Sequence, residues 1–359
     1  MLKILTVLGT RPEIIRLSEI IKVLDKFAKQ KIIHTGQNYD YNLDKIFFKN
    51  LKIRKPDKYL NARGSFANQI AKIITGIEKE IISFKPDRFV VLGDTNSSLA
   101  AITAKRMGVP VYHLEAGNRS LIKNAPEEVN RKIIDHSSDI LLPYSYRSAE
   151  NLTKEGIPRH KIFVMGNPIN EVLNVNKQYI EKSNILIKLK IIKKNYFLLT
   201  LHREENVDNL KRLKTFINIL NKVAQTYKTL IIWPIHPRTK KIIYRNNYKL
   251  NSSVKVINPL GFFDFVKLEQ NAKCILTDSG TVQEEASILK VPSIVLRENT
   301  ERPETIESGS SVINDNPLTI IDSINLSILS ENYIDSPVEY KTVKSSFIFA
   351  KIVLGKTII

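Results

Sequence analysis

The sequence is poor in cysteine, and this scarcity excludes several kinds of site. Among 359 residues Cys274 is the single cysteine. The chain can therefore form neither an internal disulfide nor a metal site built from several thiolates. The first residues, 1–13, show no signal-peptide cleavage region and have the pattern of a strand. Together these features lead us to expect a cytoplasmic protein.

Long hydrophobic runs are also missing. No uncharged apolar stretch approaches the roughly 20 residues that a membrane-spanning helix needs, so we expect no membrane partner. The composition, with 43% hydrophobic and 25% charged residues, is that of a globular protein. A chain of 359 residues is too long for one ordinary core, which predicts two domains.

Acidic residues are in the minority, with 36 against 55 basic residues and a net charge of +19. Such a charge is typical of proteins that bind nucleic acid. However, the lysines are scattered beside isoleucine and asparagine along the whole chain, and no helix-turn-helix, RNA-recognition or zinc-finger signature occurs. We therefore expect no nucleic-acid partner. An anionic small-molecule substrate fits the charge equally well.

Short apolar, β-branched runs alternate with amphipathic stretches from end to end, and continuous apolar strands separated by helices predict parallel sheets covered on both faces. The pattern predicts an α/β protein with two Rossmann-like, doubly wound domains. Helices are expected at 12–28 and 209–227, for example. The predicted strands are 3–9, 30–36, 88–94, 109–117, 139–145, 162–168, 195–206, 229–238, 254–260, 274–280 and 292–299.

Gly166 and Pro168 interrupt the pattern, a helix is expected to follow them, and a second series of elements begins at Tyr196. We therefore expect domains at 1–167 and 168–341, with a closing helix within 342–359 that packs back on the first domain. Ligands of open α/β sheets bind at the carboxyl ends of the strands. Two facing sheets thus predict a site in the cleft between the domains, built from strand-end residues.

The first strand ends in "GTRPE", with Pro12 in the first turn of a helix. This position often binds phosphate through backbone N–H groups. Neither G-x-G-x-x-G nor the Walker motif is present, so neither NAD nor ATP is favoured. Arg11 and Arg16 are candidate anion contacts, although this stretch alone fits surface arginines equally well.

Carboxylates follow two further strands, Asp94 in "GDTNSS" and Glu115 in "HLEAGNRS". Each is a candidate for the site. For Asp94 the alternative is a cap of the helix expected at 95–107. Capping explains Glu115 less well, because Gly117 and a loop follow it.

The stretch "PEEVNRKIIDH" places Glu127 and Arg131 four residues apart, on one face of a helix that Pro126 begins. Val129, Ile133 and His136 form another stripe, which we expect to pack in the core. The Glu127–Arg131 pair then faces outward, either to solvent or to the site.

His202 ends the first strand of the second domain, where histidine can contact a phosphate or shuttle a proton. No second histidine or carboxylate stands at ligand spacing from it, so the sequence does not favour a metal site.

The stretch "LTDSGTVQEEAS" combines a Ser279-Gly280-Thr281 turn with the start of a helix. Gly280 lets a ligand approach the backbone, and the N–H groups of the helix N-terminus can hold phosphate without a lysine. Glu285 flanks the expected buried stripe, where it could accept hydrogen bonds from a ribose, whereas Glu284 is expected to point away. Arg302 adds a cation downstream.

These motifs in order, "GTRPE", "GDTNSS", "EAGNR", "PEEVNR", "LHREEN", "LTDSGTVQEEA" and "ENTERPE", resemble those of the non-hydrolysing UDP-N-acetylglucosamine 2-epimerases. The resemblance covers roughly Leu2 to Thr305. It implies a glycogen-phosphorylase-like (GT-B) fold, a homodimer, a UDP-sugar bound between the domains and no cofactor.

Carried onto matching positions, the resemblance also implies roles for individual residues. The sugar would be surrounded by Asp94, Glu115, Glu127 and Arg131, and Phe265 would stack on or bracket the uracil. UDP would be held by Arg11, Arg16, His202, Ser279, Gly280, Thr281, Glu285 and Arg302.

The implied reaction inverts C2 of the sugar. C2 has no adjacent carbonyl, so direct removal of its proton would be very difficult. Anti-elimination of UDP across C1–C2 gives a glycal, and re-addition with a proton on the other face inverts C2. Proton transfer falls to Glu115 and Glu127, with Asp94 orienting the sugar or sharing the role, whereas His202 serves the phosphates.

Several alternatives remain at this point. "EAGNRS" in place of the common "EAGLRT" resembles a branch that acts on a 6-deoxy-L-sugar and gives UDP-N-acetyl-L-fucosamine. A GT-B glycosyltransferase, a hydrolysing epimerase and a non-catalytic UDP-sugar sensor share the nucleotide site, although the number of carboxylates argues against the sensor. The family's allosteric site involves residues near Gln37 and Gln69, and Asn38 departs from its pattern.

Overall fold

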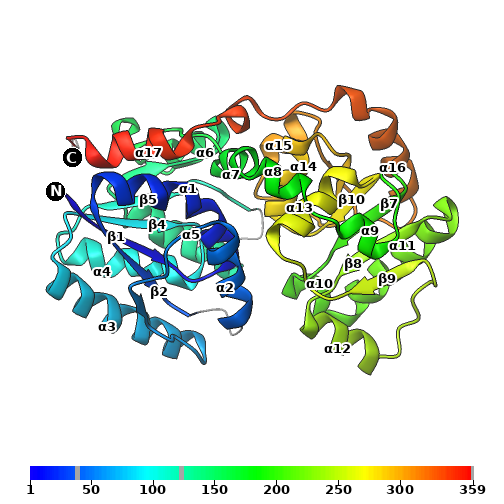
Figure 1. The fold of residues 1–359 in the computed structure, drawn as a ribbon, viewed down its shortest axis with the longest axis horizontal. Helices are drawn as coiled ribbons and strands as arrows, with labels where there is room; N and C mark the ends of the chain where they lie inside the picture. Colours follow the sequence, from blue (N-terminus) through cyan, green and yellow to red (C-terminus); the bar gives the residue numbers. More distant parts are fainter. Residues whose placement is uncertain (37–40, 121–124, 357–359) are drawn as a thin grey trace. The chain divides into compact units, whose positions relative to one another are not determined.

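The computed structural model describes residues 1–36, 41–120 and 125–356, and it contains two compact units (Figure 1). Unit 1 comprises Met1–Val175 and Val338–Ile359, and unit 2 comprises Asn176–Pro337. The boundary expected between 167 and 168 falls inside unit 1, at the start of helix α7 (Pro168–Val175). Gly166 and Pro168 therefore mark the entry to the helix expected after them, and unit 2 begins where this helix has ended, at Asn176.

Unit 1 contains a parallel six-stranded sheet in the order β3-β2-β1-β4-β5-β6. Its strands are β1 (Lys3–Leu8), β2 (Lys29–His34), β3 (Lys58–Tyr59), β4 (Arg88–Leu92), β5 (Val111–Leu114) and β6 (Ile140–Leu142). Its α-helices are α1 (Arg11–Phe27), α2 (Tyr41–Asn50), α3 (Phe66–Phe84), α4 (Ala100–Arg106), α5 (Pro126–His136), α6 (Tyr146–Lys154), α7 and α17 (Ser345–Leu354).

Helix α1 follows directly from its sequence. Thr10 and Glu13 form a capping box at its start, and Pro12 lies in the first turn, where its missing N–H needs no partner. Ile14, Leu17 and other apolar residues at helical spacing are buried. The C-terminal helix α17 packs against α1 and α7, so the end of the chain completes unit 1 (Figure 1).

Unit 2 repeats the plan with a parallel sheet in the order β12-β11-β10-β7-β8-β9. Its strands are β7 (Tyr196–Thr200), β8 (Leu230–Pro234), β9 (Val254–Ile257), β10 (Cys274–Thr277), β11 (Ser293–Val295) and β12 (Val312–Ile313). Its α-helices are α8 (Lys177–Glu181), α9 (Ile185–Leu189), α10 (Glu204–Val207), α11 (Leu210–Tyr227), α12 (Pro237–Arg245), α13 (Phe262–Asn271), α14 (Gly280–Leu289), α15 (Pro303–Glu307) and α16 (Ile320–Leu329).

Both sheets have the same connectivity when each is numbered from its own first strand. The strand order reverses between β1 and β4 in unit 1 and between β7 and β10 in unit 2. Ligands of doubly wound sheets bind at such switch points, beyond the carboxyl ends of the strands. The residues that follow these four strands are therefore the candidates for a ligand-binding site.

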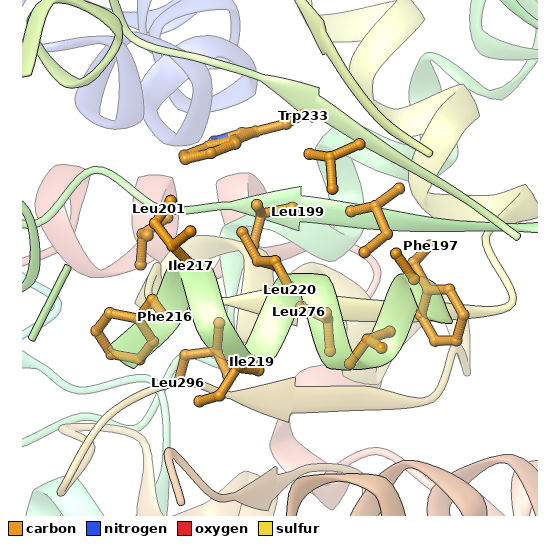
Figure 2. Close-up of a cluster of buried hydrophobic side chains, with 14 of the residues drawn as sticks. Phe197, Leu199, Leu201, Phe216, Ile217, Ile219, Leu220, Trp233, Leu276 and Leu296 are labelled. Atoms are coloured by element: carbon orange, nitrogen blue, oxygen red, sulfur yellow. The ribbon is translucent and has the colours of Figure 1, made fainter. Parts of the chain in front are cut away.

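The core of unit 2 explains why α11 lies where it does. Its Phe216, Ile217 and Leu220 are buried against Leu199 of β7 and Trp233 of β8 (Figure 2). Burying one large apolar side chain stabilises a fold by about 1.5–3 kcal/mol. The strand and helix ends that carry polar residues are thus attached to a closely packed layer.

The prediction of a strand at 162–168 is wrong. Ile162 forms an isolated bridge with Leu141, and the chain then turns at Gly166, whose φ is +77°, into α7. The sequence pattern also missed β3 and β12, which have two residues each and are too short to show a period. Within residues 1–36, 41–120 and 125–356, no helix has both the length and the apolar character needed to cross a membrane.

Candidate active site

Glu13 connects the loops that follow β1 and β4 in unit 1. Its Oε2 accepts hydrogen bonds from Gly9 N (2.5 Å) and Thr10 N (3.0 Å), and its Oε1 lies 2.5 Å from Thr95 Oγ1. Burial raises the pKa of Glu13 to about 7, although the hydrogen bonds from Thr95, Gly9 and Thr10 oppose the shift. Glu13 thus holds together the two loops at the switch point.

Gly9 is required in this loop by lack of space. A Cβ atom at this position would lie 2.1 Å from both Ser97 Oγ and Thr35 Oγ1, which are themselves 2.7 Å apart. The backbone of Gly9, after β1, therefore packs directly against the hydroxyl groups of Thr35, after β2, and Ser97, after β4. This packing positions the loop after β4, which carries Asp94.

Asp94 follows β4 and does not act as a helix cap. Thr95 caps the next turn instead, by accepting a hydrogen bond from Ser97 N. The Asp94 carboxylate lies 2.5 Å from Arg131 Nη2, and Arg131 Nη1 donates to Glu128 at 3.0 Å. This carboxylate–guanidinium–carboxylate group lies at the carboxyl ends of the unit 1 strands, a region called the unit 1 edge below; the unit 2 edge is the corresponding region of unit 2.

The predicted faces of α5 are wrong. Glu128, not Glu127, is the partner of Arg131 and is 2% exposed, whereas Glu127 is exposed. Val129 and Ile133, expected in the core, are 48% and 38% exposed. His136, also expected in the core, is exposed as well and lies 3.5 Å from Glu155.

The physical reason is that charged side chains with ionic partners form the inner face of α5. Glu128, Arg131, Ile134 and Asp135 lie on that face and are all buried. Arg131 contacts the loop after β4, and Asp135 contacts His113 on β5. Pairing offsets the desolvation that would otherwise exclude such residues from an interior.

Glu115 follows β5 and is held from two sides. Its Oε2 lies 2.6 Å from Arg16 Nη1, and Asn118 Nδ2 donates to its Oε1 at 3.3 Å. Its φ of 67° lies in the left-handed region, which costs a non-glycine residue about 1–2 kcal/mol. Arg16 also lies over the ring of Tyr144, at 5.7 Å from the ring centroid. Glu115 and Asp94 thus end neighbouring strands as ion-paired carboxylates.

In unit 2, Asp278 organises the loop after β7. The Asp278 carboxylate accepts hydrogen bonds from His202 N (3.0 Å), Arg203 N (2.9 Å) and Asn206 Nδ2 (3.1 Å). His202 Nδ1 lies 3.4 Å from the same carboxylate, and the His202 side chain is 51% exposed. Asp278 is fully buried, so it holds the loop from the protein interior. The imidazole of His202 remains exposed and can contact a ligand.

Helix α14 begins where the sequence predicted an anion-binding turn. Ser279 is its N-cap and accepts a hydrogen bond from Val282 N, and Gly280 and Thr281 open its first turn. A Cβ at Gly280 would lie 2.9 Å from Glu301 Oε1. Glu301 is held in turn by Arg203 Nη2 at 2.6 Å.

The predicted orientation of Glu284 is wrong, because this residue is fully buried and forms an ion pair with Arg302. Arg302 is itself 4% exposed and lies beside Gly280. Helix α14 is covered over most of its surface, so the apolar stripe alone did not show which of its carboxylates has a cationic partner.

Glu285 is 3% exposed and faces Glu269 of α13, which is fully buried. Burial and the neighbouring Glu285 carboxyl raise the pKa of Glu269 well above its ordinary value. Phe265, one turn earlier on α13, is half-buried against the apolar cluster that contains Val282 and Ala286. The expected ribose and uracil contacts therefore come from two helices that pack together.

Arg11 is the first residue of α1 and is half-buried. Gln37 and Asn38 lie outside the described residues, whereas Gln69 on α3 accepts a hydrogen bond from Asn96 Nδ2 at 3.0 Å. No group of three or more His, Cys, Asp or Glu side chains in the described part of the chain is arranged to hold a metal ion.

The sequence analysis missed several residues that support the predicted ones. Glu128, Asn118, His113 and Asp135 in unit 1 and Asp278 in unit 2 all contact a predicted residue or the loop that carries it. All five stand within the quoted stretches "PEEVNRKIIDH", "HLEAGNRS" and "LTDSGTVQEEAS". Their roles were missed because they depend on contacts that only the folded chain shows.

The family model for UDP-N-acetylglucosamine 2-epimerase matches residues 23–352. A UDP-N-acetylglucosamine 2-epimerase of Methanocaldococcus jannaschii is 45% identical over 336 residues, which cover 90% of this chain and 92% of that protein. A UDP-2,3-diacetamido-2,3-dideoxy-D-glucuronate 2-epimerase of Pseudomonas aeruginosa is 36% identical over 317 residues, with coverage of 87% and 88%.

The fold comparison agrees. The crystal structure of the M. jannaschii UDP-GlcNAc 2-epimerase in complex with UDP-GlcNAc and UDP matches with a TM-score of 0.92 and 43% identity, covering 98% of this chain and 99% of that one. Together with the two six-stranded parallel sheets, this match confirms the predicted GT-B-like fold. The matching family model and these relatives show that the chain belongs to the UDP-N-acetylglucosamine 2-epimerase family.

Proposed function

We propose that the protein inverts C2 of a UDP-2-acetamido sugar, interconverting UDP-N-acetylglucosamine and UDP-N-acetylmannosamine. The observation that carries the proposal is the set of ion-paired carboxylates at the carboxyl edge of unit 1, where Asp94, Glu115 and Glu128 meet Arg16 and Arg131. An epimerase that moves a proton from one face of a sugar to the other needs more than one positioned acid–base group.

The reaction proceeds by elimination and re-addition. The C1–O bond to UDP breaks with its electron pair leaving on UDP, a carboxylate removes the C2 proton, and C1 and C2 become doubly bonded. UDP then adds back to C1 while a proton is delivered to the other face of C2. Atoms and charge balance without an oxidant, since the product is an isomer of the substrate.

The unit 2 edge is suited to hold UDP throughout. We assign the diphosphate to the first turn of α14 at Ser279–Thr281 and to His202. Arg11, on α1 of unit 1, is a further phosphate contact that the family resemblance implies. Arg16 and Arg302 are ion-paired with Glu115 and Glu284, so they provide positive potential near these elements rather than unpaired charges. Glu285 and Phe265 are assigned to the ribose and the uracil.

Among the carboxylates, we assign proton transfer to Glu115 and keep Asp94 as the residue that orients the sugar or shares the transfer. Glu127 remains a candidate from the family resemblance, but Glu128 has the stronger structural argument, because it is buried and contacts Arg131. Measuring kcat of Glu127→Gln and of Glu128→Gln shows which of the two residues takes part in proton transfer. Replacing the residue that transfers a proton should lower kcat about 10²–10⁴-fold, and replacing its neighbour should lower kcat far less.

The experiment that tests the function is NMR of the purified protein with UDP-N-acetylglucosamine in deuterium oxide. We expect deuterium at C2 and formation of UDP-N-acetylmannosamine. Glu115→Gln should retain UDP binding and lose this exchange, whereas replacement of the exposed Glu78 on α3 by Gln serves as the matched control. Release of free N-acetylmannosamine would indicate a hydrolysing epimerase instead.

The sugar specificity is tested in the same way. A wild-type protein that exchanges no deuterium with UDP-N-acetylglucosamine would contradict the proposed substrate. Exchange with UDP-2-acetamido-2,6-dideoxy-L-talose would then assign the protein to the 6-deoxy-L-sugar branch, and exchange with neither would favour a GT-B transferase. The homodimer and the cytoplasmic location stay predictions, and light scattering of the purified protein checks the first.

A further inference from the structure

His113 lies on β5, two residues before Glu115, and both nitrogens of its ring contact acceptors. Nδ1 is 2.8 Å from Asp135 Oδ1, and Nε2 is 3.0 Å from the carbonyl oxygen of Gly93, the residue before Asp94. The His113 and Asp135 side chains are 1% and 0% exposed. The ring therefore bridges α5 and the end of β4 in the interior of unit 1.

The hydrogen-bond partners determine how the ring is held. A backbone carbonyl can only accept, so Nε2 carries a hydrogen. Asp135, which faces Nδ1, also receives Gly117 N at 3.2 Å and Arg119 Nη1 at 2.8 Å on its Oδ2. Burial alone would raise the pKa of Asp135, but hydrogen bonds and charges from His113 and Arg119 hold it below the ordinary value. The ring therefore lies between the Asp135 carboxyl and the Gly93 carbonyl, with a contact on each nitrogen.

Charged groups surround the buried Asp135. Arg119 contacts Asp135, lies 3.8 Å from Glu128 and lies 2.6 Å from Glu155. The Arg119 guanidinium therefore meets three carboxylates in one group. Charges that are paired and hydrogen-bonded in this way avoid the large cost of an isolated buried ion.

We propose that His113 is a positioning residue that fixes Asp94 beside Glu115 by holding the Gly93 carbonyl. The inference rests on the proposed function, because it assigns a purpose to the spacing of those two carboxylates. Gly93 and Glu115 both have left-handed backbone, with φ of 75° and 67°. The His113–Gly93 hydrogen bond and the Asp135–Gly117 hydrogen bond restrain the two segments on either side.

Two amide substitutions separate the two hydrogen bonds. The glutamine nitrogen can occupy the place of Nε2, so His113→Gln keeps a donor for the Gly93 carbonyl. The asparagine nitrogen can occupy the place of Nδ1, so His113→Asn keeps the Asp135 contact and loses the Gly93 contact. We expect kcat for epimerisation to fall about 10²-fold in His113→Asn and less than about 10-fold in His113→Gln, because small misplacement of catalytic groups costs about 10²-fold.

If His113 had a purely structural role, kcat would fall by the same factor in both variants. The dissociation constant for UDP, measured by calorimetry, should be the same as in the wild type for both variants, because Asp278 and α14 of unit 2 are untouched. Equal loss of kcat in the two variants, or a greater loss in the glutamine variant, would overturn the proposal. Circular dichroism checks that each variant is folded.

A second measurement does not depend on activity. In protein labelled with ¹⁵N-histidine, NMR should show a hydrogen on Nε2 of His113, the nitrogen that faces the Gly93 carbonyl, with the signal assigned by its loss in His113→Gln. A ring without a hydrogen on Nε2 would also overturn the proposal, even if His113→Asn failed to fold. If the wild type did not epimerise its substrate, the proposed function would fail. The NMR measurement of the His113 ring would still test the hydrogen bond to the Gly93 carbonyl.

Discussion

Glu13→Gln is the substitution for which the structure makes the sharpest stability prediction. The amide can reproduce the contacts of the protonated acid: its oxygen can accept from Gly9 N and Thr10 N, and its nitrogen can donate to Thr95 Oγ1. It cannot ionise. The variant should therefore match the wild type at low pH and exceed it at high pH.

The magnitude follows from the pKa. Burial raises the pKa of Glu13 from 4.5 to about 7. A carboxyl whose folded-state pKa lies above its unfolded value holds its proton more tightly when folded, so wild-type stability falls as pH rises through this window. From those two pKa values, the loss between pH 5 and pH 8 is about 2.5 kcal/mol. In a unit of about 200 residues, this corresponds to about 5–10 °C in Tm.

Differential scanning calorimetry at pH 5 and pH 8 measures the effect. The two units can unfold separately, so the unit 2 transition is identified by the fluorescence of Trp233, which lies in that unit. The Tm of Glu13→Gln minus that of the wild type should increase by about 5–10 °C from pH 5 to pH 8 in the unit 1 transition. A difference that is the same at both pH values would refute the reasoning. Glu78→Gln, at an exposed position, should show no pH-dependent difference.

Three further predictions concern the loops and helices of the two edges. Gly9→Ala should destabilise unit 1 by about 1–3 kcal/mol in calorimetry, because its Cβ would overlap Ser97 Oγ. Glu269→Gln should raise the Tm of unit 2 more at pH 8 than at pH 5, since burial beside Glu285 raises the pKa of Glu269 and its ionisation opposes folding. Asp278→Asn should weaken UDP binding about 10-fold or more in titration calorimetry, because the backbone N–H donors after β7 lose a charged acceptor.

The positions of the strand ends could be predicted because buried parallel strands are continuous apolar runs, and the polar residue after each run is conspicuous. Asp94 after β4 and His202 after β7 were found in this way. Strands of two residues, such as β3 and β12, carry no such pattern. The family match then confirmed the fold that the alternation of strands and helices predicted.

The side chains on α5 could not be predicted by the same reasoning. A helical wheel assigns the apolar stripe to the interior, which gave Val129 and Ile133 as core residues. The structure instead buries Glu128, Arg131 and Asp135, because they contact Arg119, Asp94 and His113, respectively, on other segments. Partners outside the helix leave no periodic trace in the sequence, so the sequence did not distinguish Glu127 from Glu128.

The two switch points share a solution that explains why so basic a chain has carboxylates there. Where the strand order reverses, successive helices cover opposite faces of the sheet, and the loops between them present backbone N–H groups that need acceptors. In unit 1, Glu13 accepts two such groups after β1 and reaches Thr95 after β4. In unit 2, Asp278 after β10 accepts those of the loop after β7. Lysine and arginine have no acceptor atoms, so the carboxylates of Glu13 and Asp278 hold these loops and leave the surface charge free to attract an anionic substrate.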